Sequence, residues 1–225
     1  MLLQILTYTH HLTTMLFGIF LSAFFLGVKQ NKKNVCILLG GGAVSGLFFL
    51  ICNTVFGSLF TEAVYPIFVH LPLFLLLVFY YRFRWLPSII SIMTAYLCCQ
   101  FSNWAGIFAL SLSGLEWVYY LVRIIVTVAV FAFLSRYLCQ TTALLLAKSD
   151  RELYILGAMP FVYYVFDYST TKFSMLLYSG NKVVVEFLAF AMCISYVIFL
   201  FVYFQEYELK NRAEQYLSLI HISEP

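Results

Sequence analysis

Charged side chains inside long apolar stretches are the residues of this sequence most able to do chemistry. Arg123, Asp167 and Glu186 each lie in a run of apolar residues, toward one end of it. A charge at the centre of a membrane-spanning helix costs about 2.5–3.5 kcal/mol on insertion scales, so such a residue usually has a partner or a function. We expect Arg123 to pair with Asp167 or with Glu186.

Tyrosines are frequent in the same stretches and would give such a pair a partly polar lining. One interpretation is an outward-facing pocket for an external ligand, formed by Arg123, Asp167, Glu186, Tyr119, Tyr164 and Tyr168, with Tyr120, Tyr163 and Tyr178 nearby. The other interpretation is a fixed ion pair between helices, which would only set how they pack. The sequence leaves both open.

A second candidate chemistry is a cysteine–histidine nucleophile made from His70 and either Cys98 or Cys99. Nothing in the spacing of these residues fixes that geometry, and a His70 hydrogen-bonded inside a helical bundle is the simpler interpretation. The six cysteines include no CxxC motif, so we expect buried, inert thiols. No metal-binding spacing of histidines and no phosphate-binding or GxSxG motif occurs, so we expect no metal, no cofactor and no catalytic residue in this chain.

The composition defines what must position these side chains. Hydrophobic residues make up 63% of the chain and charged residues 10%, with a mean hydropathy of +0.93. Soluble domains have about 45–50% apolar and about 25% charged residues, so this is an integral membrane protein. The net charge of +3 comes from short loops between apolar runs. It therefore does not indicate a nucleic-acid partner; the expected partners are membrane lipids.

The apolar runs predict an all-α polytopic membrane protein. A bilayer core of about 30 Å needs roughly 20 apolar residues per helix. Seven runs are candidates, of which the sixth is short, so we expect a seven-helix bundle with spans at residues 7–28, 35–56, 63–81, 86–110, 117–138, 153–169 and 183–204. The short connections make residues 1–204 one domain. Within the longest internal connection, residues 141–152 predict an interfacial helix with a basic end.

The basic residues predict how this bundle is oriented. Ten of the 13 lysines and arginines fall in the first, third and fifth connections and in the C-terminal tail. Positively charged loops face the cytoplasm. We therefore expect a plasma-membrane protein with its N-terminus outside and its C-terminal tail in the cytoplasm.

The last apolar run continues into a charged, helix-favouring tail at residues 205–216, with no glycine or proline at the junction. Glu206–Lys210 and Glu208–Arg212 are pairs at i,i+4 spacing. Apolar residues at heptad spacing in the tail suit either a single juxtamembrane helix or a dimeric signalling helix. The residues expected to transmit a signal are Phe204, Glu206, Leu209, Ala213 and Tyr216.

The segment PFVYYVFDYSTTKFSMLLYSGNKVVVEFLAF, followed by YFQEYELKNRAEQ, resembles the membrane input region of bacterial GHKL-type sensor histidine kinases, the group that includes the Agr-type peptide-receptor kinases. The resemblance covers residues 157–216. It implies a homodimer that senses an extracellular or membrane-borne ligand, such as a peptide, and passes the signal to a response regulator. It also implies a later phospho-acceptor helix and a domain that binds ATP and Mg. Neither is in this sequence, so this chain alone should have no kinase activity.

The last nine residues, LSLIHISEP, resemble the translation of a transposon-end adapter used in sequencing libraries. We therefore expect residues 217–225 to be non-native and the natural protein to continue after Tyr216. Three other functions remain open. A small transporter would use the charged pair as its path, a membrane peptidase would use the cysteine–histidine pair, and a structural membrane subunit would use neither.

Overall fold

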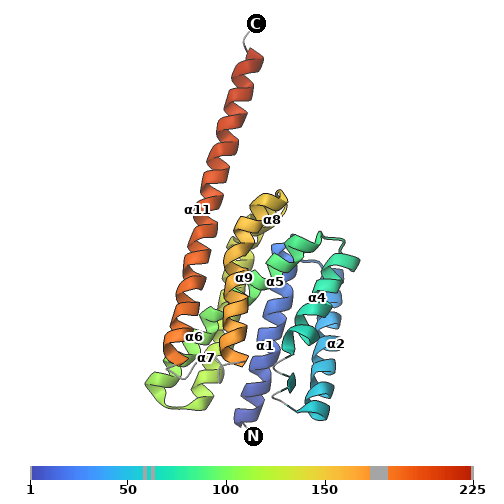
Figure 1. Cartoon of the computed structure of the whole chain (residues 1–225), viewed down its shortest axis with the longest axis vertical. Coiled ribbons are helices and arrows are strands. Elements are labelled where there is room, and N and C mark those ends of the chain that lie inside the picture. The colour runs from blue at the N-terminus through green and yellow to red at the C-terminus, as the bar shows by residue number, and fades with distance from the viewer. Residues whose placement is uncertain (1, 58–59, 62–63, 173–181, 224–225) are drawn as a thin grey trace.

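The fold is all-helical, as the sequence predicts. The structure is a computed structural model that describes residues 2–57, 60–61, 64–172 and 182–223, and every regular element within them is a helix. In chain order (Figure 1) these are α1 Leu2–Phe25, α2 Lys32–Phe56, η1 Pro66–His70, α4 Leu71–Leu75, η2 Leu76–Tyr80, α5 Trp85–Cys98, α6 Gln100–Ser113, α7 Glu116–Tyr137, α8 Cys139–Leu146, α9 Asp150–Lys172 and α11 Lys182–Ser223.

Four helical stretches of the described chain are long and apolar enough to cross a membrane. They are Lys32–Phe56, Trp85–Ser113, Glu116–Tyr137 and Phe190–Ala213. These correspond to the second, fourth, fifth and seventh expected spans, so a membrane location is consistent with the fold. The complete set of seven spans stays a prediction.

The other three expected spans are helical but differ from a regular apolar span. The third is a shorter run, Pro66–Tyr80, in which the π-helical turns η1 and η2 enclose α4. Helices α1 and α9 are long enough, but they are more polar: α1 contains His10 and His11, and the apolar part of α9 contains Asp167.

Helix α1 lies at the centre of the bundle and packs against α7, α5, α8 and α2. Its inward face carries fully buried residues such as Leu21 and Phe25. Small residues bring α2 close to it. A Cβ added at Gly42 would be 3.0 Å from Ile19 Cδ1, and one at Gly46 would be 3.4 Å from Met15 Cε.

Two expected elements have different bounds. The helix expected at 86–110 is divided at Cys99, where α5 ends and α6 begins. The interfacial helix expected at 141–152 is α8, which ends at Leu146. Residues 147–149 form a turn, and Asp150 begins α9, because Ala147 and Lys148 close α8 with hydrogen bonds to Ala143 O and Leu145 O.

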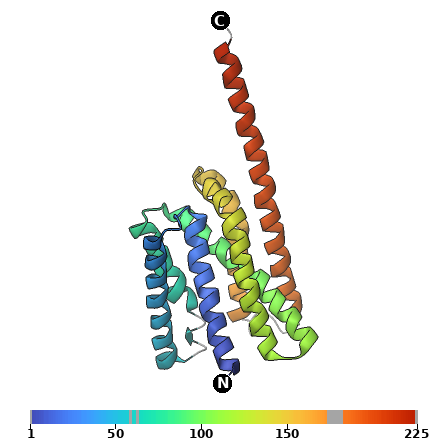
Figure 2. The same cartoon turned by 180° about the vertical axis from the view of Figure 1, so that it is seen from behind.

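The basic connections gather at one end of the molecule, the end from which α11 projects (Figures 1 and 2). A Cβ at Gly27, in the connection after α1, would be 3.5 Å from Ala143 Cβ in α8. Arg84, just before α5, donates from Nη1 to Lys148 O at 3.1 Å and pairs with Asp150. The first, third and fifth connections therefore meet at the same end, which we call the basic end.

Helix α11 is one continuous element of 42 residues. Its last part extends well past the bundle (Figure 1). The expected continuity across Phe204 and Gln205 is confirmed. Of the two expected pairs, Arg212 and Glu208 lie 3.5 Å apart, whereas Glu206 and Lys210 form no ion pair in the described structure.

Candidate functional site

Polar side chains inside the bundle form two clusters, of which the first is centred on Arg123 of α7. The guanidinium donates a hydrogen bond from Nη1 to the Tyr119 hydroxyl and lies over the Tyr119 ring, with Cζ 5.1 Å from the ring centroid. Its Nε is buried and makes no hydrogen bond within the described part of the chain. Arg123 therefore retains a donor for an acceptor that those residues do not supply.

Helices α1 and α6 enclose this Arg123 cluster. His10 of α1 is 4% exposed; its Nδ1 lies 3.3 Å from Thr14 Oγ1, and its ring is 5.9 Å from that of Tyr120. On the other side, Gly106 of α6 lies directly against the Arg123 stem. Nothing in the composition or span pattern singled out His10. Its four-residue spacing to Thr14 was the available signal.

The second cluster is centred on His70 and joins the third apolar run to α5 and α9. His70 Nδ1 lies 2.8 Å from the Tyr164 hydroxyl, and the Tyr96 hydroxyl donates to Asp167 Oδ2 at 2.6 Å. The His70 ring is 5.3 Å from the Tyr65 ring, 5.6 Å from that of Tyr96 and 5.5 Å from that of Tyr164. We call these five residues the His70 cluster.

Local backbone geometry positions His70. It ends the π-helical turn η1, which begins at Pro66, and Pro72 follows two residues later. Proline lacks the amide hydrogen that regular helical pairing needs, which favours such irregular turns. π-Helical turns often occur at functional sites because they change the direction in which side chains project. The expected hydrogen-bonded His70 is confirmed.

Of the two expected partners of Arg123, which are Asp167 and Glu186, the structure describes the side chain of Asp167 only. Arg123 and Asp167 form no ion pair, because Asp167 is on the face of α9 that packs on α5, whereas Arg123 faces α6. The Cys99 thiol is within electrostatic reach of both charges. The side chains of Glu186 and Tyr168 lie outside the described residues, and a pair between Arg123 and Glu186 stays a prediction.

The cysteine–histidine nucleophile is not assembled. Cys98 contacts the Cys193 thiol, and Cys193 Sγ lies 3.1 Å from Leu97 O. Cys99 Sγ instead lies 3.5 Å from Ala95 O. The partner of His70 Nδ1 is the Tyr164 hydroxyl and not a thiol. Within the residues that the structure describes, no group of three or more histidine, cysteine or acidic side chains could hold a metal ion.

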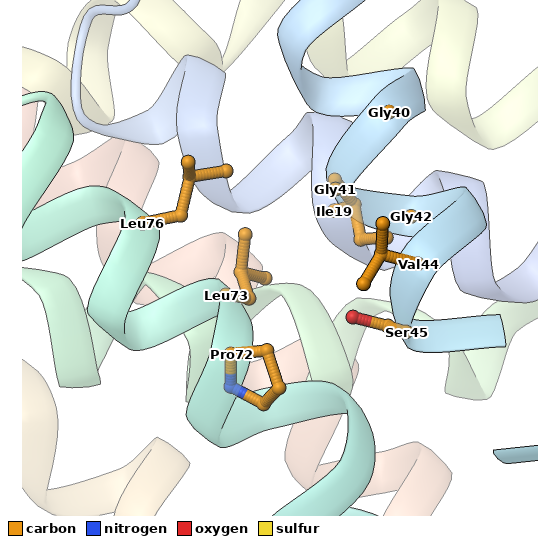
Figure 3. A pocket seen from close by; sticks show the side chains of 9 residues that line it. All are labelled: Ile19, Gly40, Gly41, Gly42, Val44, Ser45, Pro72, Leu73 and Leu76. Carbon is orange, nitrogen blue, oxygen red and sulfur yellow. The ribbon is translucent and has the colours of Figure 1, made fainter. Parts of the chain in front are cut away.

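An apolar cavity of about 230 Å³ lies between α1, α2 and the third apolar run (Figure 3). Its wall includes Gly40, Gly41 and Gly42 on one side and Pro72, Leu73 and Leu76 on the other. The Ser45 hydroxyl is the polar side chain drawn among its lining residues. This cavity suits an apolar chain and offers no partner for a charged ligand.

Taken together, the clusters hold donors, acceptors and aromatic faces but no assembled nucleophile and base. Such an arrangement can bind a polar or charged group. Comparisons with protein families, with curated proteins and with solved structures find no match to this chain.

Proposed function

We propose that this chain is the membrane input region of a bacterial GHKL-type sensor histidine kinase, with seven crossings of the plasma membrane. The observation that supports this best is the continuity of α11, which runs along one side of the bundle to well beyond the basic end as one helix. A stiff helix can carry a tilt or rotation over its whole length. The kinase core, with its ATP and Mg, and the response regulator would follow this helix in the natural protein.

In this proposal the Arg123 and His70 clusters form the sensing site. Arg123 and Tyr119 are in the first half of α7, and Tyr164 and Asp167 are in the second half of α9. These halves of the two helices are away from the basic end (Figure 1). With the basic end in the cytoplasm, this half faces the exterior. The ligand would be extracellular or membrane-borne, such as a peptide. It would have to bind two helix arrangements with different affinity in order to send a signal.

The same proposal includes a homodimer through α11. Val202 is 50% exposed and Leu209 is 66% exposed, and Ala213 is exposed as well. These residues follow heptad spacing along α11 from the basic end of the bundle outward, and a second copy would cover them. Phe204 is half-buried and Glu206 is exposed, while the side chain of Tyr216 lies outside the described residues.

Insertion of one residue between Phe204 and Gln205 tests the signalling role in the intact parent protein. One extra residue rotates the following helix by about 100°, so basal autophosphorylation should change. A Gly-Gly insertion at the same point should uncouple output from ligand. Unchanged basal and ligand-dependent output in both variants would count against transmission through α11.

A reporter fused after Ala213 tests the orientation separately. Alkaline phosphatase is active only outside the cytoplasm, and a fluorescent protein that folds in the cytoplasm gives the opposite signal. We expect fluorescence and no phosphatase activity at this position. Phosphatase activity there would contradict a cytoplasmic basic end.

A further inference from the structure

The turn between α8 and α9 holds the base of α11 through one lysine. Lys148 Nζ lies 4.7 Å from the centroid of the Tyr203 ring and 3.9 Å from that of Tyr207, and it donates to the Tyr203 hydroxyl at 3.3 Å. It also pairs with Glu152 at 3.4 Å. Although Lys148 is in a surface turn, its side chain is only 10% exposed. We call these four residues the Lys148 clamp.

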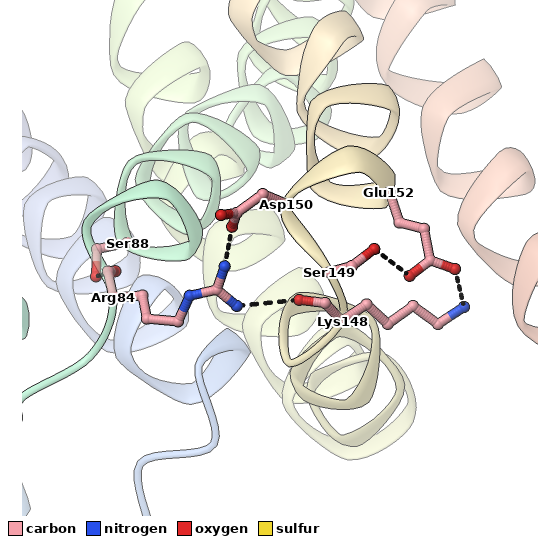
Figure 4. Close-up of polar contacts among 6 residues, drawn as sticks. All are labelled: Arg84, Ser88, Lys148, Ser149, Asp150 and Glu152. Carbon is pink, nitrogen blue, oxygen red and sulfur yellow. Dashed lines mark hydrogen bonds and ion pairs between the residues drawn. The ribbon is translucent and has the colours of Figure 1, made fainter.

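The turn that carries Lys148 is itself fixed to the rest of the bundle. Arg84 donates to the Lys148 carbonyl and pairs with Asp150, while Ser149 Oγ donates to Glu152 Oε2 at 3.1 Å (Figure 4). Arg84 precedes α5, and its carbonyl accepts from Ser88 Oγ at 2.8 Å. A short chain of contacts therefore joins the start of α5 to the point where α11 leaves the bundle.

The clamp defines one rotational setting of α11. Tyr203 and Tyr207 are four residues apart, so both rings project from the same face of the helix. They are on either side of the junction between Phe204 and Gln205, where the apolar run ends. A rotation by one residue, about 100°, would move both rings away from Lys148 together.

A polar cavity of about 300 Å³ lies beside these contacts and gives them room to open. Besides the clamp residues, it is lined by Glu206, Lys210 and Asn211 of α11. Lys210 lines this cavity without a hydrogen bond, ion pair or ring contact in the described structure. It provides a matched lysine that is close to the clamp but not part of it.

We propose that the Lys148 clamp holds the projecting part of α11 in a resting position and that its release is a step in transmission. Aromatic rings bind a cation that is shielded from water, and the Glu152 carboxylate orients that cation. A movement of α11 in the membrane separates the rings from Lys148 and frees the helix. The signalling consequence rests on the proposed function, whereas the mechanical restraint does not.

The test measures the position of α11 directly in the full chain, reconstituted in lipid nanodiscs. Spin labels carried by unnatural amino acids replace Leu144 on α8 and Leu209 on α11, which are 55% and 66% exposed. Pulsed electron resonance gives the distribution of distances between them. The variants are Lys148→Met, which keeps the apolar stem, and Tyr207→Leu, which leaves Lys148 and Glu152 paired; Lys210→Met is the control.

For the parent chain and for Lys210→Met we expect a single narrow distribution of distances. For Lys148→Met and Tyr207→Leu we expect a distribution that is roughly twofold broader or displaced, because a helix that loses tertiary contacts samples more positions. Unchanged distance distributions in both clamp variants would show that Lys148 does not hold α11 in place. A different outcome is that the same substitutions change the distances but leave basal autophosphorylation of the intact parent protein unchanged. That result would support the restraint on α11 and contradict the proposed signalling role of α11.

Discussion

Gly106 of α6 lies directly beneath the stem of Arg123 of α7. A Cβ added at Gly106 would be 2.8 Å from Arg123 Cδ and closer still to Cγ. It would also be 3.1 Å from Cδ2 of Tyr119, the residue whose hydroxyl accepts from Arg123. The absence of a side chain at 106 thus allows α6 to approach α7 where the half-buried guanidinium is held.

Gly106→Ala should destabilise the protein by about 1–3 kcal/mol, because overpacking forces the Arg123 stem away from Tyr119. In a domain of this size, about 1 kcal/mol lowers Tm by roughly 2–4 °C. Thermal unfolding in detergent measures this. Gly40→Ala is the control, since a Cβ there has no neighbour within 4 Å. A Tm equal to that of the control would show that Arg123 does not depend on this contact.

The hydroxyl of Tyr164 should contribute to stability through His70. Tyr164→Phe removes the partner 2.8 Å from His70 Nδ1 and leaves a buried ring nitrogen without it, a loss of about 1–3 kcal/mol. Tyr154→Phe on the same helix is the control, because Tyr154 is 61% exposed. Chemical unfolding in mild detergent compares the two. Equal free energies of unfolding would mean that the hydrogen bond to His70 contributes no net stability.

The sequence predicted the helices well and the partners of their polar residues less well. Hydropathy and length identify α2, α7 and α11 because a span must be apolar along its whole length. They do not reveal the division at Cys99, which depends on how α6 packs against α7. Nor do they reveal that Lys148 is shielded by Tyr203 and Tyr207, more than 50 residues later in the chain.

The charged pair shows the same limit. A buried charge predicts a partner, but several tyrosines and acids are available, and only the rotation of each helix decides between them. Asp167 faces Tyr96, and Arg123 faces Tyr119. Two charges expected to meet thus contact different phenol hydroxyls, within the part of the chain that the structure describes.

The contribution of Glu152 should depend on pH. Partial burial raises the pKa of its carboxyl, but the Ser149 hydroxyl and the Lys148 ammonium outweigh this, so its pKa lies below the usual value. A carboxylate with a lowered folded-state pKa stabilises the folded state above its unfolded pKa, and this contribution is lost as pH falls through the folded-state pKa. Glu152→Gln should therefore lower Tm at neutral pH and have a smaller effect at about pH 3.

Glu208→Gln serves as the control for this pH dependence. Glu208 and Arg212 are 48% and 67% exposed, and an exposed pair of this kind contributes little. The Tm of Glu208→Gln should match that of the parent chain at both pH values. If Glu152→Gln behaves in the same way as Glu208→Gln, the carboxylate does not support Lys148.

Cys98 and Cys193 should form a disulfide that joins α5 to α11. The thiols are in direct contact, and both residues are buried, with exposures of 1% and 0%. Diamide accepts the two electrons and two protons that the thiols lose when the S–S bond forms. Because buried thiols react slowly, we expect the bond to appear only after long treatment or at temperatures where the bundle opens locally.

Peptide mass spectrometry under non-reducing conditions identifies the Cys98–Cys193 disulfide, and Cys193→Ser should abolish it. Cys36, which is exposed on α2, should not be found linked to Cys193 within one chain. A link from Cys193 to Cys36, or none to Cys98 even after prolonged oxidation of the folded protein, would show that α11 does not lie against α5 as described.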